Sequence, residues 1–200
     1  MFDPLLLTHQ PVLGGDLVRL EPMGVKHLDG LWPMFLDEDV RAGTGTMHQF
    51  AREQVRAGLA KAASREDRAD WAVVRVEDDA VIGEVVLMGL DEDVEAMSFR
   101  IALTGPAVFG RGYGTQATRL VRDFALGPLG LHRLSLEVNA DNTAAIRVYV
   151  RCGFQLEGVR RDAGRRDGRW FDVHDMALLT GDPRPRPPQD PGYAQDARGS

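Results

Sequence analysis

A glycine-rich segment between a predicted strand and a predicted helix is the strongest constraint on how this chain folds. Its residues are Gly110, Arg111, Gly112, Tyr113, Gly114 and Thr115. The strand is predicted over residues 97–103, and the helix over residues 114–126 carries apolar side chains along one face. Glycines let the backbone approach a ligand closely, and a helix start offers free N–H groups at the positive end of its dipole. The segment therefore predicts a phosphate or pyrophosphate site.

Two common nucleotide-binding motifs do not fit this segment. The phosphate loop of nucleotide hydrolases needs Gly-Lys-Ser/Thr after its glycines, and the chain has no such sequence. The dinucleotide fingerprint needs glycine or alanine at the position of Thr115, and a parallel first strand near the start of the unit. On these six residues alone, a glycine-rich connection that binds no ligand stays open as the alternative.

The order of predicted elements changes halfway along the chain. The first half reads strand, two helices and three strands, at residues 17–22, 27–36, 50–63, 71–76, 81–88 and 97–103. Acidic turns such as Asp78-Asp79 join its antiparallel hairpins. The second half reads helix, strand, helix and two strands, at residues 114–126, 133–138, 143–151, 154–160 and 170–179. Asp141 or Asn142 caps the second of these helices, and Asp167-Gly168 predicts a tight hairpin turn.

Composition favours one globular domain in a reducing compartment. The 200 residues, 44% of them hydrophobic, can bury a core as a single domain over residues 1–180, and the proline-rich residues 181–200 predict a disordered tail. No apolar run approaches the roughly 20 residues that span a bilayer, and the first residues do not form a secretion signal. The single Cys152 excludes an intramolecular disulfide. We expect a cytoplasmic protein that does not bind membranes.

The charge of the chain argues against nucleic acid as a partner. The net charge is −6, whereas binding to a phosphate backbone needs a basic face. Several arginines do lie between Arg160 and Arg169, and a solvated, charged hairpin is their default interpretation. No metal site is expected either, because Asp172 and His174 would supply too few ligands on one strand face.

Two motifs in this order resemble those of the GNAT acetyltransferase superfamily. Pro106-x-x-Phe109 followed by the glycine-rich segment is similar to the pyrophosphate motif of the family. The second motif reads Asn142-x-x-Ala145-Ile146-x-Val148-Tyr149-x-x-Cys152-Gly153-Phe154. It is similar to the Asn…Tyr…Gly-Phe segment of the family, and the resemblance covers about residues 17–179. The aromatic Phe109, where much of the superfamily has Gln or Arg, resembles the branch that acetylates ribosomal-protein N-termini.

The resemblance implies a fold and a co-substrate. The expected fold is α/β (α+β), with a mixed, mostly antiparallel central sheet flanked by helices and a splay between the two central strands. Acetyl-CoA would pair its pantetheine arm with the strand before the glycine-rich segment, which would hold the pyrophosphate. The implied binding residues are Ala102, Leu103, Thr104, Phe109, Gly110, Arg111, Gly112, Tyr113, Gly114, Thr115, Asn142 and Tyr149.

The resemblance also implies catalytic groups. Tyr149 matches the tyrosine that protonates the departing thiolate, and a phenol near its ordinary pKa of about 10 suits that leaving group. The alternative is a core tyrosine. Many family members place a glutamate base at the position that Ser98 has here. Glu84, on the neighbouring strand, and Glu95, at the start of the strand, could act through water, although each is also explained as a surface or hairpin carboxylate.

Two functions follow from these motifs. The main hypothesis is an acetyl-CoA-dependent N-acetyltransferase that transfers acetyl directly to a primary amine, either of a protein N-terminus or of a small molecule. The alternative is a catalytically silent acyl-CoA-binding or sensing module, which Ser98 in the position of the base leaves open. The helices of the first half and the loop at residues 43–48 would select the acceptor. Family members are often dimers, so a homodimer is also considered.

Overall fold

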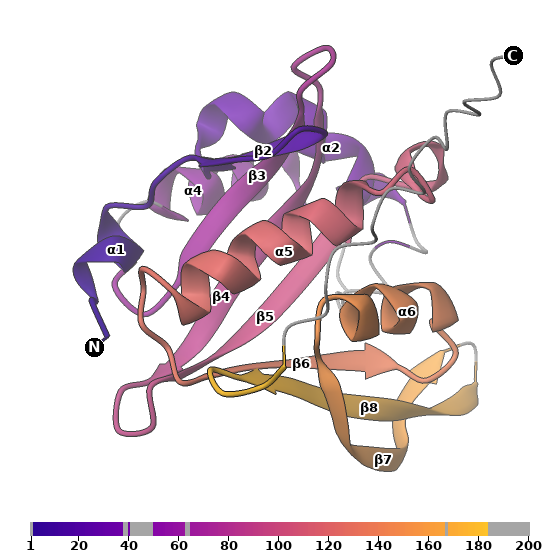
Figure 1. Cartoon of the computed structure of the whole chain (residues 1–200). Coiled ribbons are helices and arrows are strands. Elements are labelled where there is room, and N and C mark those ends of the chain that lie inside the picture. Colours follow the sequence, from indigo (N-terminus) through magenta and orange to yellow (C-terminus); the bar gives the residue numbers. More distant parts are fainter. Residues whose placement is uncertain (1, 38–39, 41–49, 63–64, 167, 184–200) are drawn as a thin grey trace, which may run out of the picture.

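One mixed sheet forms the centre of the protein. A computed structural model describes residues 2–37, 40, 50–62, 65–166 and 168–183 (Figure 1). The strands are β1 (Leu13–Gly14), β2 (Val18–Pro22), β3 (Ala69–Arg75), β4 (Val81–Asp91), β5 (Ala96–Leu103), β6 (Arg133–Asn139), β7 (Gln155–Arg166) and β8 (Arg169–Leu179). Their order across the sheet is β1-β2-β3-β4-β5-β6-β8-β7. Neighbouring strands are antiparallel except β5 and β6, which are parallel. The expected mixed, mostly antiparallel sheet is thereby confirmed.

Helices cover both faces of this sheet (Figure 1). They are α1 (Leu5–Thr8), α2 (Leu28–Leu36), α4 (Arg52–Ala62), α5 (Tyr113–Leu126) and α6 (Thr143–Arg151), with single 3-10 turns at Val25–His27 and Pro106–Val108. Side chains alternate between the faces of a strand. Trp71 and Val73 of β3 therefore pack in the core beneath α5 and α6, while Ala72 and Val74 pack beneath α2 and α4. None of the described helices is long and apolar enough to cross a membrane.

The sheet opens between its two parallel strands. β5 and β6 pair only at Ala96↔Arg133, Met97↔Leu134 and Ser98↔Ser135. β5 then continues to Leu103 alongside β4, and β6 continues to Asn139 alongside β8. The two strands diverge in Figure 1. This divergence is the splay expected from the sequence, and it leaves one edge of β5 without a partner strand in the described structure.

Most predicted elements occur with their ends shifted by a few residues. α6 has the predicted bounds, and the choice of cap falls on Asn142, whose Oδ1 accepts a hydrogen bond from Ala145 N at 3.1 Å. α1 and β1 were not predicted, because a four-residue helix and a two-residue strand are too short to show a period. β7 runs beyond the predicted end near Arg160 to Arg166, because the polar residues of this edge strand still pair with β8.

Some predictions fall partly or wholly outside the described residues. These are the loop at residues 43–48, Asp167 of the predicted hairpin turn, and the tail from residue 184 onward. At the described start of this segment, Asp182 Oδ2 accepts a hydrogen bond from Leu179 N at 2.9 Å. A single domain over residues 1–180 stays a prediction.

Candidate active site

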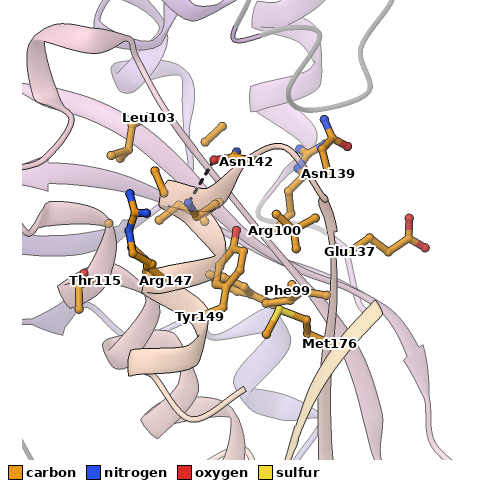
Figure 2. A pocket seen from close by; sticks show the side chains of 18 of the residues that line it. Phe99, Arg100, Leu103, Thr115, Glu137, Asn139, Asn142, Arg147, Tyr149 and Met176 are labelled. Atoms are coloured by element: carbon orange, nitrogen blue, oxygen red, sulfur yellow. Dashed lines mark hydrogen bonds between the residues drawn. The ribbon is translucent and has the colours of Figure 1, made fainter. Parts of the chain in front are cut away.

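A cleft of about 1680 Å³ opens where β5 and β6 separate. Its walls come from β5, β6, α6 and the loop that leads into α5 (Figure 2). The predicted site residues that line it are Ser98, Ala102, Leu103, Phe109, Gly110, Gly112, Tyr113, Gly114, Thr115, Asn142 and Tyr149. Glu84, Glu95, Thr104 and Arg111 are not among its described lining residues. The fold thus brings together three segments that are separated in the sequence.

The glycine-rich segment forms the N-terminal end of α5. Gly110 and Gly112 have φ angles of 72° and 84°, a left-handed conformation that side chains disfavour. Gly112 is the N-cap residue, and the helix makes an early backbone hydrogen bond from Gln116 N to Gly112 O at 3.0 Å. The N–H groups before Gln116 have no partner within the helix. They point to an anion site at this end of the cleft.

Tyr149 places a free hydroxyl in the cleft. The residue is only 7% exposed and packs edge-on against the rings of Phe99 and Phe154. Its hydroxyl points into the cleft (Figure 2) and has no hydrogen bond to any described residue. Burial, with a smaller effect of the nearby Cys152 thiol, raises the pKa of Tyr149 to about 12. The ordinary pKa expected from the sequence was therefore too low, and the phenol is fully protonated at neutral pH.

Two serines stand at the apex of the cleft, where the strands separate. Ser98 Oγ and Ser135 Oγ are 3.3 Å apart, and Ser135 Oγ also donates to Met97 O at 3.4 Å. Both serines line the cleft. At the position where the resemblance expects a glutamate base, the structure therefore offers a pair of hydroxyl groups.

The two candidate glutamates lie elsewhere. Glu84 is buried on the face of β4 that α2 and α4 cover, and its Oε1 accepts a hydrogen bond from Arg100 Nη2 at 2.9 Å. Burial raises the pKa of Glu84 despite this cation. Glu95 precedes β5 with φ 49°, and its carbonyl accepts hydrogen bonds from the backbone N–H groups of His132 and Arg133. Neither carboxylate is beside the Ser98 hydroxyl, and their assignment as bases stays a prediction.

The sequence analysis did not assign most of the arginines that line the cleft, among them Arg100, Arg147 and Arg151. Arg147 and Arg151 lie one turn apart on α6, and no ion pair joins either to a described residue. The end of α6 contacts the first turn of α5, since Cys152 Sγ lies 3.7 Å from Thr115 O. Figure 2 shows Arg147 on the Thr115 side of the cleft. The i, i+4 spacing was the available signal, but only the fold places these cations near the glycine-rich segment.

Comparisons with known proteins agree with this geometry. The acetyltransferase (GNAT) domain model matches residues 18–155. A probable N-acetyltransferase, YjcK of Bacillus subtilis (strain 168), is 30% identical over 118 residues, which are 59% of this chain and 65% of that protein. The N-alpha-acetyltransferase RimI of Mycobacterium tuberculosis is 41% identical over 78 residues, 39% of this chain and 46% of RimI. The matches therefore span less than two thirds of these relatives.

A solved structure shows the same fold. Spermidine N-acetyltransferase from Vibrio cholerae, in complex with CoA and spermine, superposes with a TM-score of 0.77 at 20% identity, covering 84% of this chain and 98% of that chain. The finer likeness to the branch that acetylates ribosomal-protein N-termini has only weak support. The family model covers more than half of the chain, and its residues 18–155 include both the glycine-rich motif and the motif that begins at Asn142. The chain therefore belongs to the GNAT acetyltransferase family.

Proposed function

We propose that this chain is an acetyl-CoA-dependent N-acetyltransferase that transfers acetyl directly to a primary amine. The observation that carries the proposal is the cleft between β5 and β6, which has free helix N–H groups at one end and the Tyr149 hydroxyl inside. Membership of the family and the acetyltransferase relatives support it.

The residues of the cleft fit acetyl-CoA. The edge of β5 beyond Ser98 has no partner among the described strands, so Ala102 and Leu103 can offer backbone groups to the amides of the pantetheine arm. The N–H groups of the glycine-rich segment suit the pyrophosphate. Arg147 adds a cation on the Thr115 side of the cleft (Figure 2), Arg151 is a second cation in its lining, and guanidinium groups bind phosphate well. Bound in this way, acetyl-CoA would supply the acetyl thioester to the apex of the cleft.

Transfer needs two proton movements. A nitrogen–carbon bond forms, the carbon–sulfur bond breaks, the amine loses a proton and the sulfur gains one. We assign the sulfur side to Tyr149, whose protonated hydroxyl can donate to the developing thiolate. Its pKa of about 12 makes Tyr149 a weak acid. The hydroxyl therefore stabilises the negative charge that develops on sulfur in the transition state, and the proton is not transferred before the carbon–sulfur bond breaks. We assign the amine side to the Ser98 and Ser135 hydroxyls, which can pass the proton to water.

The alternative function is a catalytically silent acyl-CoA-binding or sensing module. One observation favours it, namely that Ser98 stands where many family members have a glutamate. The acceptor of an active enzyme would be a protein N-terminus or a small-molecule amine, and the named activities of the relatives include both kinds of acceptor. A homodimer is a further expectation, which sedimentation would test.

Two measurements on the same protein separate these functions. Isothermal titration with acetyl-CoA tests the site, and release of the CoA thiol with a panel of amines, amino acids, polyamines and peptides tests turnover. Binding with acetylation of at least one amine supports the enzyme. Binding without acetylation of any amine supports the silent module. If the folded protein does not bind acetyl-CoA, both functions are wrong.

A further inference from the structure

Arg100 is a cleft residue whose hydrogen-bonding capacity is largely unused. It lies on β5, two residues beyond Ser98, and its side chain is 32% exposed. A guanidinium has five N–H donors. Nη2 donates to Glu84, Nε is buried without a partner, and no described residue accepts a further hydrogen bond from this side chain. An arginine so placed has donors to offer to a ligand with several oxygen atoms.

An ion pair with Glu84 of the neighbouring strand restricts the position of the Arg100 side chain. Glu84 is 14% exposed and lies on β4, where its register partner is Ala102, next to Arg100 on the same strand face. On β3, the buried Asp70 shares a register row with Arg100 and is bound by Arg68. Val86 of β4 lies between Asp70 and Arg100 in that row, and Glu84 forms its ion pair with Arg100 from the next row on the same face. A side chain fixed at one end in this way has a defined direction for its remaining donors.

The carboxylates of the cleft do not neutralise Arg100. Glu137 and Asp175 are both bound by Arg160, and Glu157 is bound by Arg133. Asp37 also lines the cleft, but it lies beside Gly105, beyond the far end of β5. Among the described residues, Glu84 is therefore the one carboxylate that pairs with Arg100, and the other N–H donors of the Arg100 side chain have no described acceptor. An oxyanion close to Arg100 would gain charge-assisted hydrogen bonds from these unused donors, whereas a second ammonium group of an acceptor would gain none from them.

Arg100 and Tyr149 lie on opposite faces of β5. Side chains alternate along a strand, so Ser98 and Arg100 face the α2 and α4 side, whereas Phe99 packs against Tyr149 on the other side. The leaving sulfur would meet Tyr149 from one face. An acceptor would approach the same apex from the face that carries Arg100.

We infer that Arg100 binds a carboxylate of the acceptor, so the acceptor is an amino acid or a similar amine with a carboxylate close to the amine. The inference rests on the proposed function. It excludes polyamines as good acceptors, and it also excludes peptide N-termini that lack a nearby carboxylate.

Matched acceptors test this inference. Each amino acid in the panel is compared with its own carboxamide and with the amine that lacks the carboxylate. For the unmodified protein, kcat/KM should be at least about tenfold higher for the acid, the effect of one charge-assisted hydrogen bond. In Arg100→Gln this ratio should fall to about one, mainly through KM of the acid. In Arg56→Gln, an exposed change on α4, the ratio should stay as in the unmodified protein.

A double variant controls for the possibility that Arg100→Gln alone disturbs folding. Arg100→Gln leaves Glu84 buried without its cation, whereas the double variant Arg100→Gln/Glu84→Gln removes both charges. The double variant should also show a ratio of about one. A preference for the carboxamide or a polyamine in the unmodified protein, or an unchanged ratio in both variants, would overturn the inference.

The role of Arg100 can be tested even if the proposed enzymatic function is wrong. If acetyl-CoA binds but no amine is acetylated, the proposed function fails, and equilibrium binding then decides the role of Arg100. The same acids and carboxamides are titrated into the CoA-saturated protein and into Arg100→Gln. Tighter binding of the acid, lost in the variant, supports the inference, and equal or absent binding of the acid contradicts it.

Discussion

Ser98 Oγ and Ser135 Oγ lie 3.3 Å apart at the last register pair between β5 and β6. Beyond this pair the strands part, so the contact marks the apex of the cleft. Ser135 Oγ lies 3.4 Å from Met97 O, to which it donates. In the mechanism that we propose, an amine approaching the thioester would release its proton at this hydroxyl pair.

Replacing Ser98 with alanine should slow catalysis without weakening acetyl-CoA binding. The cofactor would contact the backbone of β5, which the change leaves intact, whereas the proton route loses one hydroxyl. We expect kcat to fall by about 10- to 100-fold at pH 7. The defect should shrink as pH rises, because more of the amine is then already deprotonated. Steady-state kinetics from pH 7 to 9 would measure it, and an unchanged kcat would contradict the assignment.

Replacing Tyr149 with phenylalanine should affect turnover more than binding. The hydroxyl has no described hydrogen-bond partner, so its loss removes no contact of the resting protein. We expect kcat to fall by about 100-fold or more, while the Kd for acetyl-CoA changes by less than about threefold. Equal kcat in the variant would remove Tyr149 from the mechanism, and a parallel loss of acetyl-CoA affinity would indicate a binding role.

The same substitution should change stability at alkaline pH. Burial raises the pKa of Tyr149 to about 12 in the folded state, against about 10 in the unfolded chain. Tyr149 therefore supports folding below pH 10, and this contribution is lost as pH rises toward 12. At pH 11 the free energy of unfolding should have fallen by about 1 kcal/mol more in the unmodified protein than in Tyr149→Phe. Urea titrations at pH 8 and 11 would show this difference, and parallel declines would contradict the buried state of the phenol.

Arg147 should contribute to cofactor affinity through the phosphates. Arg147→Ala removes a cleft-lining cation that has no described ion pair. One charge-assisted hydrogen bond is worth about 1.5–3 kcal/mol, so the Kd for CoA should rise by about tenfold or more. The matched control is Arg56→Ala, an exposed arginine on α4, which should leave the Kd unchanged. Equal Kd values for both variants would place Arg147 outside the phosphate site.

The sequence predicted the part of the site that depends on local backbone. The glycines at Gly110 and Gly112 could be assigned to a helix start because their conformational freedom and the following apolar period are local properties. The bounds of α6 were predictable for the same reason, and so was a cap at Asp141 or Asn142, of which the structure has Asn142. Tyr149 was found through its place in the second motif, and its raised pKa was not, because burial depends on Phe99 and Phe154 from other elements.

The charged residues of the cleft could not be assigned from the sequence. The alternation of side chains along β5 places Arg100 on the same face as Ser98. Whether Arg100 can bind a ligand depends on its ion pair with Glu84 of β4 and on the divergence of β5 from β6, which the sequence does not reveal. The polar end of β7 was missed because an edge strand needs no apolar side chains, and its hydrogen bonds to β8 are tertiary information. Local patterns therefore predicted elements and turns, whereas long-range pairing decided which charges meet.

The most direct test of the acetyl-CoA site is a titration of two glycine variants. Gly112 is unsuitable because its φ of 84° would strain any side chain, whereas a Cβ on Gly114 would meet only Leu103 Cδ1 at 3.7 Å. Gly114→Leu keeps a helix-compatible residue and extends a side chain toward β5, into the cleft. Gly58→Leu on α4, where a Cβ would meet no atom within 4 Å, is the matched control.

Isothermal titration with acetyl-CoA should show binding to the unmodified protein and to Gly58→Leu, and none to Gly114→Leu. The Tm of each variant should be equal to or higher than that of the unmodified protein, since leucine favours helix over glycine. Binding to Gly114→Leu with unchanged affinity would contradict the position of the site. Failure of the folded, unmodified protein to bind acetyl-CoA would contradict the function itself.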